Sequence, residues 1–240
     1  MSRLRLILAS LWYHRRLHAA AGLGVIAATA VLTGALLVGD SMRGSLRRLA
    51  LERLGGIDEV LVTDRFFRTK LADEVPAYGE QQIVPAVALR GTVNSALGAT
   101  ANGVGLYGID DRFWVLWPDR SAATPPAGEV LINRALADEL HLAIGDEVIV
   151  RLPTISQVPR ESLLGRKSET VTSRRLRISG ILSNSNAGSF SLNPSQQAVF
   201  NVFLRLAEMQ DILDEPERAN ALLFADDLSG GDLSAQHDQL

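Results

Sequence analysis

The feature of the sequence that most constrains its fold is an uncharged apolar run near the N-terminus. Residues 17–39 contain no Asp, Glu, Lys or Arg over 23 positions. As an α-helix, at about 1.5 Å of rise per residue, this run would be roughly 34 Å long, which exceeds the roughly 30 Å hydrocarbon core of a bilayer. The run is apolar all the way round, whereas a helix on a soluble core has a polar face. We therefore expect one transmembrane helix over residues 17–39.

A cleavable secretory leader is the main alternative to a permanent span. Leaders have an apolar region of only about 7–15 residues, followed by a cleavage site with small residues. The run here is longer and ends in Leu37-Val38-Gly39-Asp40, without a clean A-x-A pattern. Length and flanks favour a permanent span.

Charge is distributed unevenly along the chain. Residues 1–56 hold eight Arg against Asp40 and Glu52, a net charge of +6, so the remaining 184 residues carry −9 of the total of −3. A basic segment of this kind belongs beside a membrane surface. Four arginines lie on each side of the span, so the positive-inside rule gives no orientation; we expect the short N-terminal side inside, because a long domain translocates largely regardless of its charge. The chain has no Cys, which excludes disulfides and thiolate metal sites.

The segment before the span, residues 1–16, has the residues of a membrane interface. Trp12 and Tyr13 are expected at the headgroup level, with Arg15 and Arg16 beside them. We predict a cytoplasmic, interfacial segment that leads into the bilayer.

The segment after the span, residues 40–56, has an amphipathic helix pattern. Apolar Met42, Leu46, Leu49 and Leu54 recur every three to five residues, with arginines between them. We predict that the transmembrane helix continues as a stalk until the glycine pair at 55–56 ends it.

Residues 57–228 alternate short strand and helix patterns, which predicts a mixed α+β extracytoplasmic domain after the membrane helix and stalk. The expected strands are 59–63, 83–95 with a break at Pro85, 102–110, 130–132, 147–152, 173–182, 199–204 and 219–225, and the expected helices include 65–75 and 206–213. A polar excursion is expected over 153–172, and a disordered or truncated tail over 229–240.

The clearest local unit lies within residues 128–152. Asn133 is predicted to cap a helix whose buried face includes Leu136 and Leu140. The pair Gly145-Asp146 is predicted to turn the chain into the next strand.

No motif in the chain supports an active site. The G-x-G-x-x-G spacing of residues 103–108 needs a strand before it and a helix after it to bind a dinucleotide, and acidic residues with no clear long helix follow it here. The four His have no metal-ligand spacing, and His141 is better explained as a helix C-terminal residue than as a catalytic one. Aromatic Phe113, Trp114 and Trp117 are expected to pack in the core. We expect no enzymatic activity, no cofactor, no metal and no nucleic-acid partner.

A basic group lies in the excursion and the strand after it. Arg160, Arg166 and Lys167 are candidates for contact with anionic lipid or with a partner protein. The alternative is a solvated loop, followed by a charged strand face at Arg174, Arg175 and Arg177.

Four stretches give the chain a resemblance to a known family. They are LASLWYHRRLHAAAGLGVIAATAVLTGALLVGDSMRGSLRRLALERLG, NGVGLYGIDDRFWVLW, GEVLINRALADELHLAIGDEVIVRLP and FSLNPSQQAVFNVFLRLAEMQ, in this order within residues 9–225. The chain resembles the N-terminal part of an FtsX-like, MacB-like ABC transporter permease with a large extracytoplasmic domain. It departs from that pattern in lacking the three later helices, so it resembles a fragment or a truncated gene product.

The resemblance implies a function by mechanotransmission. A separate ABC ATPase would drive the stalk, and the stalk would reshape the outer domain to export or extract a lipoprotein, peptide or drug. It also implies the bacterial inner membrane, contact with membrane lipid, and a homo- or hetero-dimer with another permease. Two other functions stay open on the residues alone: a single-pass anchored binding or sensor domain without an ATPase, and an anchored hydrolase that uses His141 or a carboxylate pair.

Overall fold

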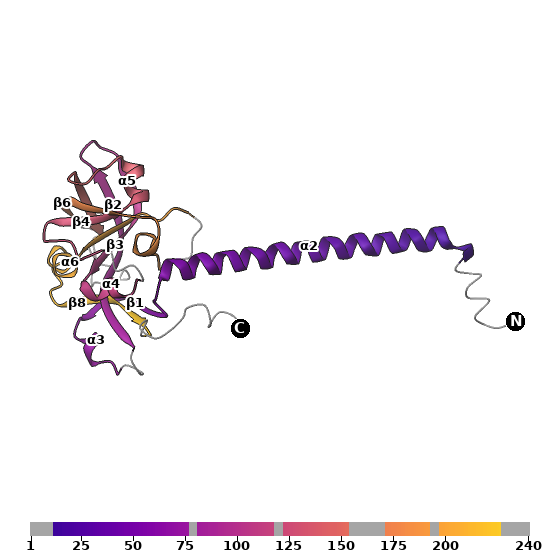
Figure 1. Ribbon diagram of the computed structural model, residues 1–240, viewed down its shortest axis with the longest axis horizontal. Helices are drawn as coiled ribbons and strands as arrows, with labels where there is room; N and C mark the ends of the chain where they lie inside the picture. The colour runs from indigo at the N-terminus through magenta and orange to yellow at the C-terminus, as the bar shows by residue number, and fades with distance from the viewer. Residues whose placement is uncertain (1–11, 77–80, 118–121, 154–170, 193–196, 227–240) are drawn as a thin grey trace, which may run out of the picture. The chain divides into compact units, whose positions relative to one another are not determined.

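The computed structural model describes residues 12–76, 81–117, 122–153, 171–192 and 197–226 (Figure 1). The chain divides into two compact units, Met1–Arg48 and Leu49–Leu240. The elements in chain order are α2 (Arg15–Leu54), β1 (Glu59–Arg68), α3 (Leu71–Glu74), β2 (Gln82–Ser95), β3 (Thr100–Ile109), α4 (Asp111–Val115), β4 (Glu129–Asn133), α5 (Arg134–Leu140), β5 (Glu147–Pro153), β6 (Val171–Leu182), the 3-10 helix η1 (Asn186–Ser189), β7 (Asn201–Arg205), α6 (Leu206–Leu213) and β8 (Arg218–Ala225).

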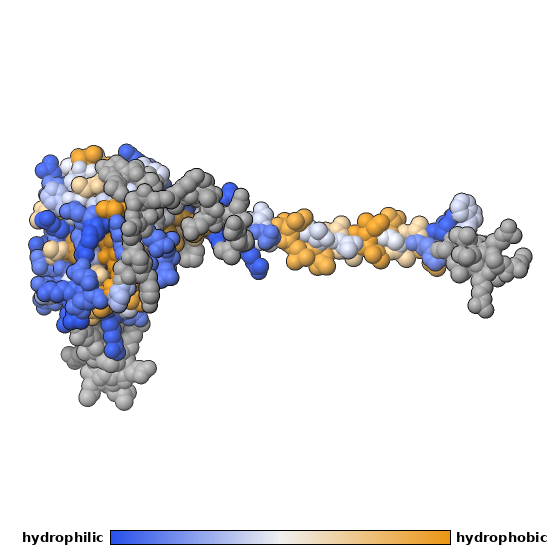
Figure 2. Space-filling view, turned by 60° about the horizontal axis from the view of Figure 1, so that its bottom comes forward, coloured by the Kyte–Doolittle hydropathy of each residue, from blue (hydrophilic) through white to orange (hydrophobic). Residues whose placement is uncertain are grey.

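The first unit is dominated by α2, which continues for 40 residues and ends inside the second unit. It contains no buried residue and is long and apolar enough to cross a membrane. Figure 2 shows its apolar side chains as a band between hydrophilic ends. Within this band the hydroxyl of Thr29 donates to the carbonyl of Val25, which satisfies a polar group without water.

The second unit is an α+β domain built on a mixed sheet. The described residues form eight strands in the order β1-β8-β2-β3-β7-β4-β6-β5. Because β5 pairs with both β6 and β2, six of these strands close into a ring, β2-β3-β7-β4-β6-β5. β8 and β1 extend the sheet from the N-terminal half of β2.

Alternation along the strands separates two hydrophobic cores. In β2, Val87 and Val93 belong to the core inside the ring, which α5 and α6 also cover. Val84 and Ala86 on the opposite face belong to a second core, which contains most of the buried aromatic side chains. The period-2 pattern of a single strand thus contributes to both cores.

A β-bulge in β3 has a glycine as its extra residue. Val104 pairs with Gly91 and Asn102 pairs with Thr92, so Gly103 is the extra residue, with φ +69°. This left-handed conformation favours glycine.

Several predicted bounds differ from those of the structure, and the largest difference is in the helix after β1. The helix expected over 65–75 is reduced to Leu71–Glu74, because Phe67 and Arg68 continue β1 and pair with Ala219 and Arg218 of β8. Aromatic residues suit a strand when a pairing partner is present, and this tertiary contact outweighs the local helix pattern.

Pro85 does not break β2. It pairs with Leu222 of β8, in the part of the described strand that precedes the pairing with β3 at Val87. Proline has no backbone N–H, so it is tolerated in a strand on a side where no neighbouring strand needs that donor. β2 therefore continues through Pro85. The excursion is also shorter than predicted, because Pro153 ends β5 and Val171 begins β6; residues 154–170 and the tail 229–240 lie outside the described residues.

Candidate functional site

The candidate site is the junction at which α2 enters the second unit, residues 49–57. α2 ends at Leu54, and Gly55 adopts φ +62°, as the glycine pair predicts. The N–H of Ile57 donates to the carbonyl of Leu54 at 3.2 Å, and the N–H of Gly56 donates to the carbonyl of Leu116 at 3.1 Å. The chain is therefore fixed to the domain by its backbone within two residues of the helix end.

Side chains also attach the end of α2 to the domain. Ile57 is buried in the second core, and Leu54 packs against that core. A Cβ at Gly55 would overlap the ring of Trp117, so the indole lies directly against the backbone at the helix end. Trp117 is itself buried, as are Phe113 and Trp114, which confirms that these aromatics pack in the core.

A chain of ring contacts leads from Trp117 to the central strands. Its ring centroid lies 6.0 Å from that of Phe113 and 6.0 Å from that of Phe190. Phe190 in turn contacts Tyr107 of β3 at 4.8 Å, and Tyr107 stacks with Phe203 of β7 at 5.5 Å. Burial raises the pKa of the Tyr107 hydroxyl to about 12, and the positive charge of Arg90 acts in the opposite direction. The helix end and the ring of strands therefore share one packed aromatic cluster.

The backbone after the junction enters the sheet at once. The N–H of Asp58 donates to the carbonyl of Phe224 in β8 at 2.9 Å, and the Asp58 carboxylate accepts from the N–H of Asp226 at 2.9 Å. β1 begins at the next residue, Glu59. A displacement of the helix end would thus act directly on the β1–β8 pair.

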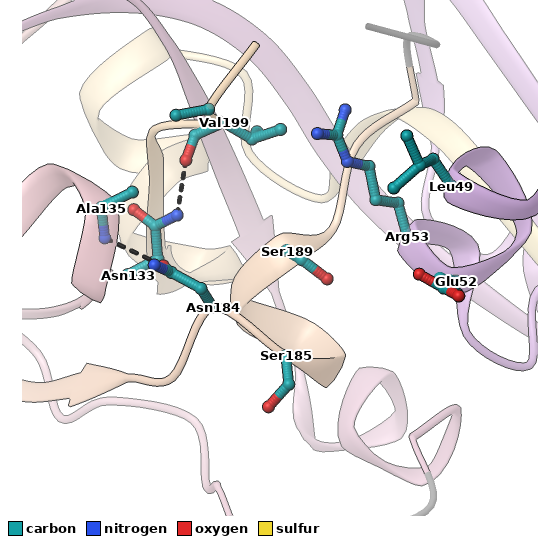
Figure 3. Close-up of a pocket in the computed structure, with 10 residues that line it drawn as sticks. Leu49, Glu52, Arg53, Asn133, Ala135, Asn184, Ser185, Ser189 and Val199 are labelled. Carbon is teal, nitrogen blue, oxygen red and sulfur yellow. Dashed lines mark hydrogen bonds between the residues drawn. The ribbon is translucent and has the colours of Figure 1, made fainter. Parts of the chain in front are cut away.

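A cleft of about 570 Å³ lies on another side of the last helical turn. Figure 3 shows Leu49, Glu52 and Arg53 of α2 on one wall, and Asn184 and Ser185 on the other. The Arg53 guanidinium donates to the carbonyl of Gln197 at 3.0 Å, which spans from the helix to the loop before β7. The remaining lining residues are Asn133, Ala135, Ser189, Ala198 and Val199.

Asn133 organises the domain wall of this cleft. As predicted, its side chain caps α5 by accepting from the N–H of Leu136 at 3.2 Å. The same oxygen accepts from the N–H of Asn201 at 3.1 Å, and its amide nitrogen donates to the carbonyls of Gly188 at 3.0 Å and Val199 at 2.6 Å. These long-range bonds have no local sequence signal, because only the fold brings η1 and the start of β7 close to Asn133.

The membrane-interface residues of the sequence analysis are exposed. Trp12 and Tyr13 are 73% and 83% exposed, and the guanidinium of Arg15 lies 5.4 Å from the centroid of the Trp12 ring. Arg16 is exposed as well. This arrangement is that of a cation–π pair at the start of the apolar band.

The four predicted stalk residues have different environments. Met42 is 57% exposed, and Leu46 is half-buried. Leu49 lines the cleft and Leu54 joins the second core, so only the last part of the stalk belongs to the domain. The basic candidates Arg160, Arg166 and Lys167 lie outside the described residues.

The glycine motif and His141 have structural roles. Residues 103–108 lie within β3, where a Cβ at Gly108 would come 2.7 Å from Cβ of Met209 in α6. His141 ends α5 with φ 53°, and its Nδ1 lies 2.8 Å from the carbonyl oxygen of Asp138. The side chains of Arg174, Arg175 and Arg177 in β6 are exposed. Among the described residues, no group of His, Asp and Glu is placed to hold a metal ion.

Comparison with known proteins gives likeness in structure alone. No protein-family model and no curated protein sequence matches the chain. The periplasmic region of MacB from Actinobacillus actinomycetemcomitans is similar with a TM-score of 0.43 and 12% identity, over 78% of this chain and 83% of that one. The extracellular domain of the noncanonic ABC-type transporter YknZ from Gram-positive bacteria is similar with a TM-score of 0.42 and 8% identity, over 72% of this chain and 83% of that one.

Proposed function

We propose that the chain is a permease-type subunit of an ABC transporter, or the N-terminal part of one, in which α2 transmits motion between the membrane and the outer domain. The observation that carries this proposal is the continuity of α2. One 40-residue helix contains both the apolar span and the turn that docks at the aromatic core. A helix is stiff along its axis because each turn is hydrogen-bonded to the next, so movement at one end reaches the other.

The junction is suited to receiving such a movement. Leu54, the Gly56–Leu116 hydrogen bond and the Arg53–Gln197 hydrogen bond attach the last turn to three different parts of the domain. The cleft leaves space beside that turn, whereas the contact between Gly55 and Trp117 is tightly packed. We infer that a tilt of α2 opens or closes the cleft and pulls on β1 and α4.

The remaining elements of the proposal rest on the sequence resemblance. A separate ABC ATPase supplies the energy, and the subunit itself is not an enzyme. The domain lies outside the bacterial inner membrane, and the subunit works as a dimer with a like or unlike permease. The cargo is a lipoprotein, a peptide or a drug.

The absence of cysteine makes a clean test feasible. In the full chain, Glu52→Cys and Ser185→Cys place one thiol on each wall of the cleft, and thiol-reactive cross-linkers of graded length then fix its width. Thr92→Cys with Asn102→Cys provides the matched control, since these side chains already contact each other at 3.1 Å across β2 and β3. The readout is vanadate-sensitive ATP hydrolysis by the complex purified through a tag on the chain.

We expect cross-links across the cleft to lower this ATP turnover several-fold, and reduction of the linker to restore it. The control cross-link should leave it unchanged. Absence of any co-purifying ATPase, or equal turnover with the cleft fixed at every width, would contradict the proposal.

The cleft also favours one alternative, an anchored binding or sensor domain. Its polar lining of amides and hydroxyls beside Arg53 is suited to a ligand. In that case, the purified chain would bind its ligand without an ATPase, and the cross-link would block ligand binding instead of ATP turnover.

A further inference from the structure

We propose that Arg43, Arg47 and Arg48 form a binding surface for anionic phospholipid headgroups in the leaflet on the domain side of the membrane. We name this surface the arginine collar. The proposal rests on the membrane insertion of α2 given above, and it concerns residues that the transport proposal does not use.

The collar carries uncompensated positive charge. All three side chains are exposed, and within the described residues none of them takes part in a hydrogen bond or an ion pair. The acid nearest to them toward the apolar band is Asp40, three residues before Arg43. Glu52 lies four residues after Arg48 on the same helix, so two carboxylates can neutralise at most two of the three guanidinium groups, and a net positive charge remains for a ligand of opposite sign.

The spacing of the arginines matches a bilayer. Arg16 precedes the apolar run and Arg43 follows it, 27 residues later on the same helix. At about 1.5 Å per residue, their Cα atoms are roughly 40 Å apart, and a bilayer measures about 40–45 Å with its headgroups included. Arg16 and the collar therefore lie at the headgroup levels of the two leaflets, and Figure 2 shows hydrophilic residues at both ends of the apolar band.

The positions of the arginines also fit the direction of helical side chains. Side chains of an α-helix lean toward its N-terminus. At the N-terminal end this lean points away from the bilayer, and Arg16 directly adjoins the apolar run. At the other end the lean points back toward the bilayer, and Arg43 follows Gly39 only after three residues. Arg47 and Arg48, one turn further on, thus extend toward the phosphate level rather than into bulk water.

The collar has an open centre on the helix surface. Gly44 lies three residues before Arg47 and four before Arg48, so Gly44 and these two arginines share one face of the helix. A Cβ at Gly44 would meet no atom within 4 Å. A phosphate oxygen can therefore approach the helix here and accept hydrogen bonds from two guanidinium groups, whose planar donors suit phosphate geometry.

Fluorescence of the full chain in detergent micelles tests the collar. A bimane label on Ser45→Cys is unique because the chain has no other cysteine. The titrants are phosphatidylglycerol, phosphatidylcholine and inorganic phosphate. Three proteins are compared: the labelled parent, its Arg43→Gln, Arg47→Gln, Arg48→Gln variant, and a control with the same charge loss at exposed domain positions, Arg134→Gln, Arg174→Gln and Arg205→Gln.

We expect the parent to prefer phosphatidylglycerol over phosphatidylcholine, with an effect of about fivefold for each arginine near the surface. The collar variant should lose about 20- to 100-fold in apparent affinity for phosphatidylglycerol. The control should stay within about twofold. High salt should weaken the preference in the parent.

Three results would overturn the proposal. The parent and the collar variant could bind phosphatidylglycerol with equal affinity, or the control could lose as much affinity as the collar variant. Inorganic phosphate could also saturate the parent at the concentration at which phosphatidylglycerol does. Resistance of the parent to alkaline extraction from membranes is measured separately. Loss of that resistance would contradict the span and hence the transport proposal, whereas an inserted chain without lipid preference would contradict the collar alone.

Discussion

Gly55 is the residue whose replacement should most directly report the junction. Position 55 requires glycine for two separate reasons: its φ is +62°, and a Cβ there would overlap the Trp117 ring. For Gly55→Ala we expect a loss of about 2–5 kcal/mol in the free energy of unfolding, from about 1–2 for the left-handed conformation and about 1–3 for the overlap with the indole. Urea denaturation followed by tryptophan fluorescence measures it.

Gly98→Ala is the matched control for this prediction. Gly98 also has a positive φ, +89°, but a Cβ there would meet no atom within 4 Å. We expect the conformational cost alone, about 1–2 kcal/mol. In a Trp117→Leu background the Gly55→Ala cost should fall toward that of the control; an unchanged cost would show that the indole contact is unimportant.

Tyr107 should make the stability of the domain depend on pH in the alkaline range. Its folded pKa is raised to about 12 by burial, whereas an unfolded tyrosine titrates near 10. Between about pH 10 and 12 the unfolded state has lost this proton and the folded state keeps it, so stability is complete below about pH 10 and falls as the pH rises through this window, by up to about 3 kcal/mol. Urea midpoints at about pH 9 and pH 11.5 should therefore drop more in the wild type than in Tyr107→Phe, and parallel drops would contradict the assignment.

Asn133 shows what can be predicted from the sequence at the scale of one residue. Its role as a cap is local, since it depends on a polar residue just before a helical pattern, and it is confirmed. Its bonds to Gly188, Val199 and Asn201 are not local, because they join positions at least 55 residues away in the chain. The domain wall of the cleft was therefore not predicted.

At the scale of elements, the predictions succeeded where the local pattern and the tertiary contacts agree. α6 was predicted at its observed bounds, Leu206–Leu213, and β5 differs from its prediction only by including Pro153. The helix over 65–75 was wrong because β8, more than 140 residues later, pairs with Phe67 and Arg68. A strand that depends on a distant partner leaves too weak a signal in its own residues.

α2 gives the prediction that belongs to an element. Ser45→Pro should interrupt the helix at a cost of about 3 kcal/mol, because the ring removes one N–H donor and collides with the preceding turn. We expect faster amide exchange in residues 41–45, while the unfolding of the domain, followed through Trp114 and Trp117, changes by less than about 0.5 kcal/mol.

Ser45→Ala is the control for the interruption, since alanine favours a helix. If α2 transmits motion, the proline variant should also lose the coupling between the cleft and ATP turnover, and the alanine variant should keep it. A proline variant with normal coupling would contradict the role of helix continuity.

At the scale of the whole molecule, the end of α2 and the start of the second compact unit fall at different residues. The glycine pair at 55–56 favoured a domain that begins at residue 57, and the helix does end there. By its contacts, however, the second unit begins at Leu49, inside the helix. A helix-ending signal marks a change in backbone conformation, and it carries no information on which residues pack together.

Two shortened chains test this boundary. A chain of residues 49–240 keeps Leu54, Ile57 and the hydrogen bond from Gly56 to Leu116, whereas a chain of residues 59–240 lacks all three and uncovers Trp117. Burial of one large aliphatic side chain contributes about 1.5–3 kcal/mol, so we expect the shorter chain to be less stable by about 3–5 kcal/mol. Urea unfolding measures the difference through Trp114 and Trp117, which both chains retain. Equal stability would place the boundary after the junction and would remove the structural basis for transmitting force through it, whereas the expected loss would show that the end of the membrane helix is part of the domain core.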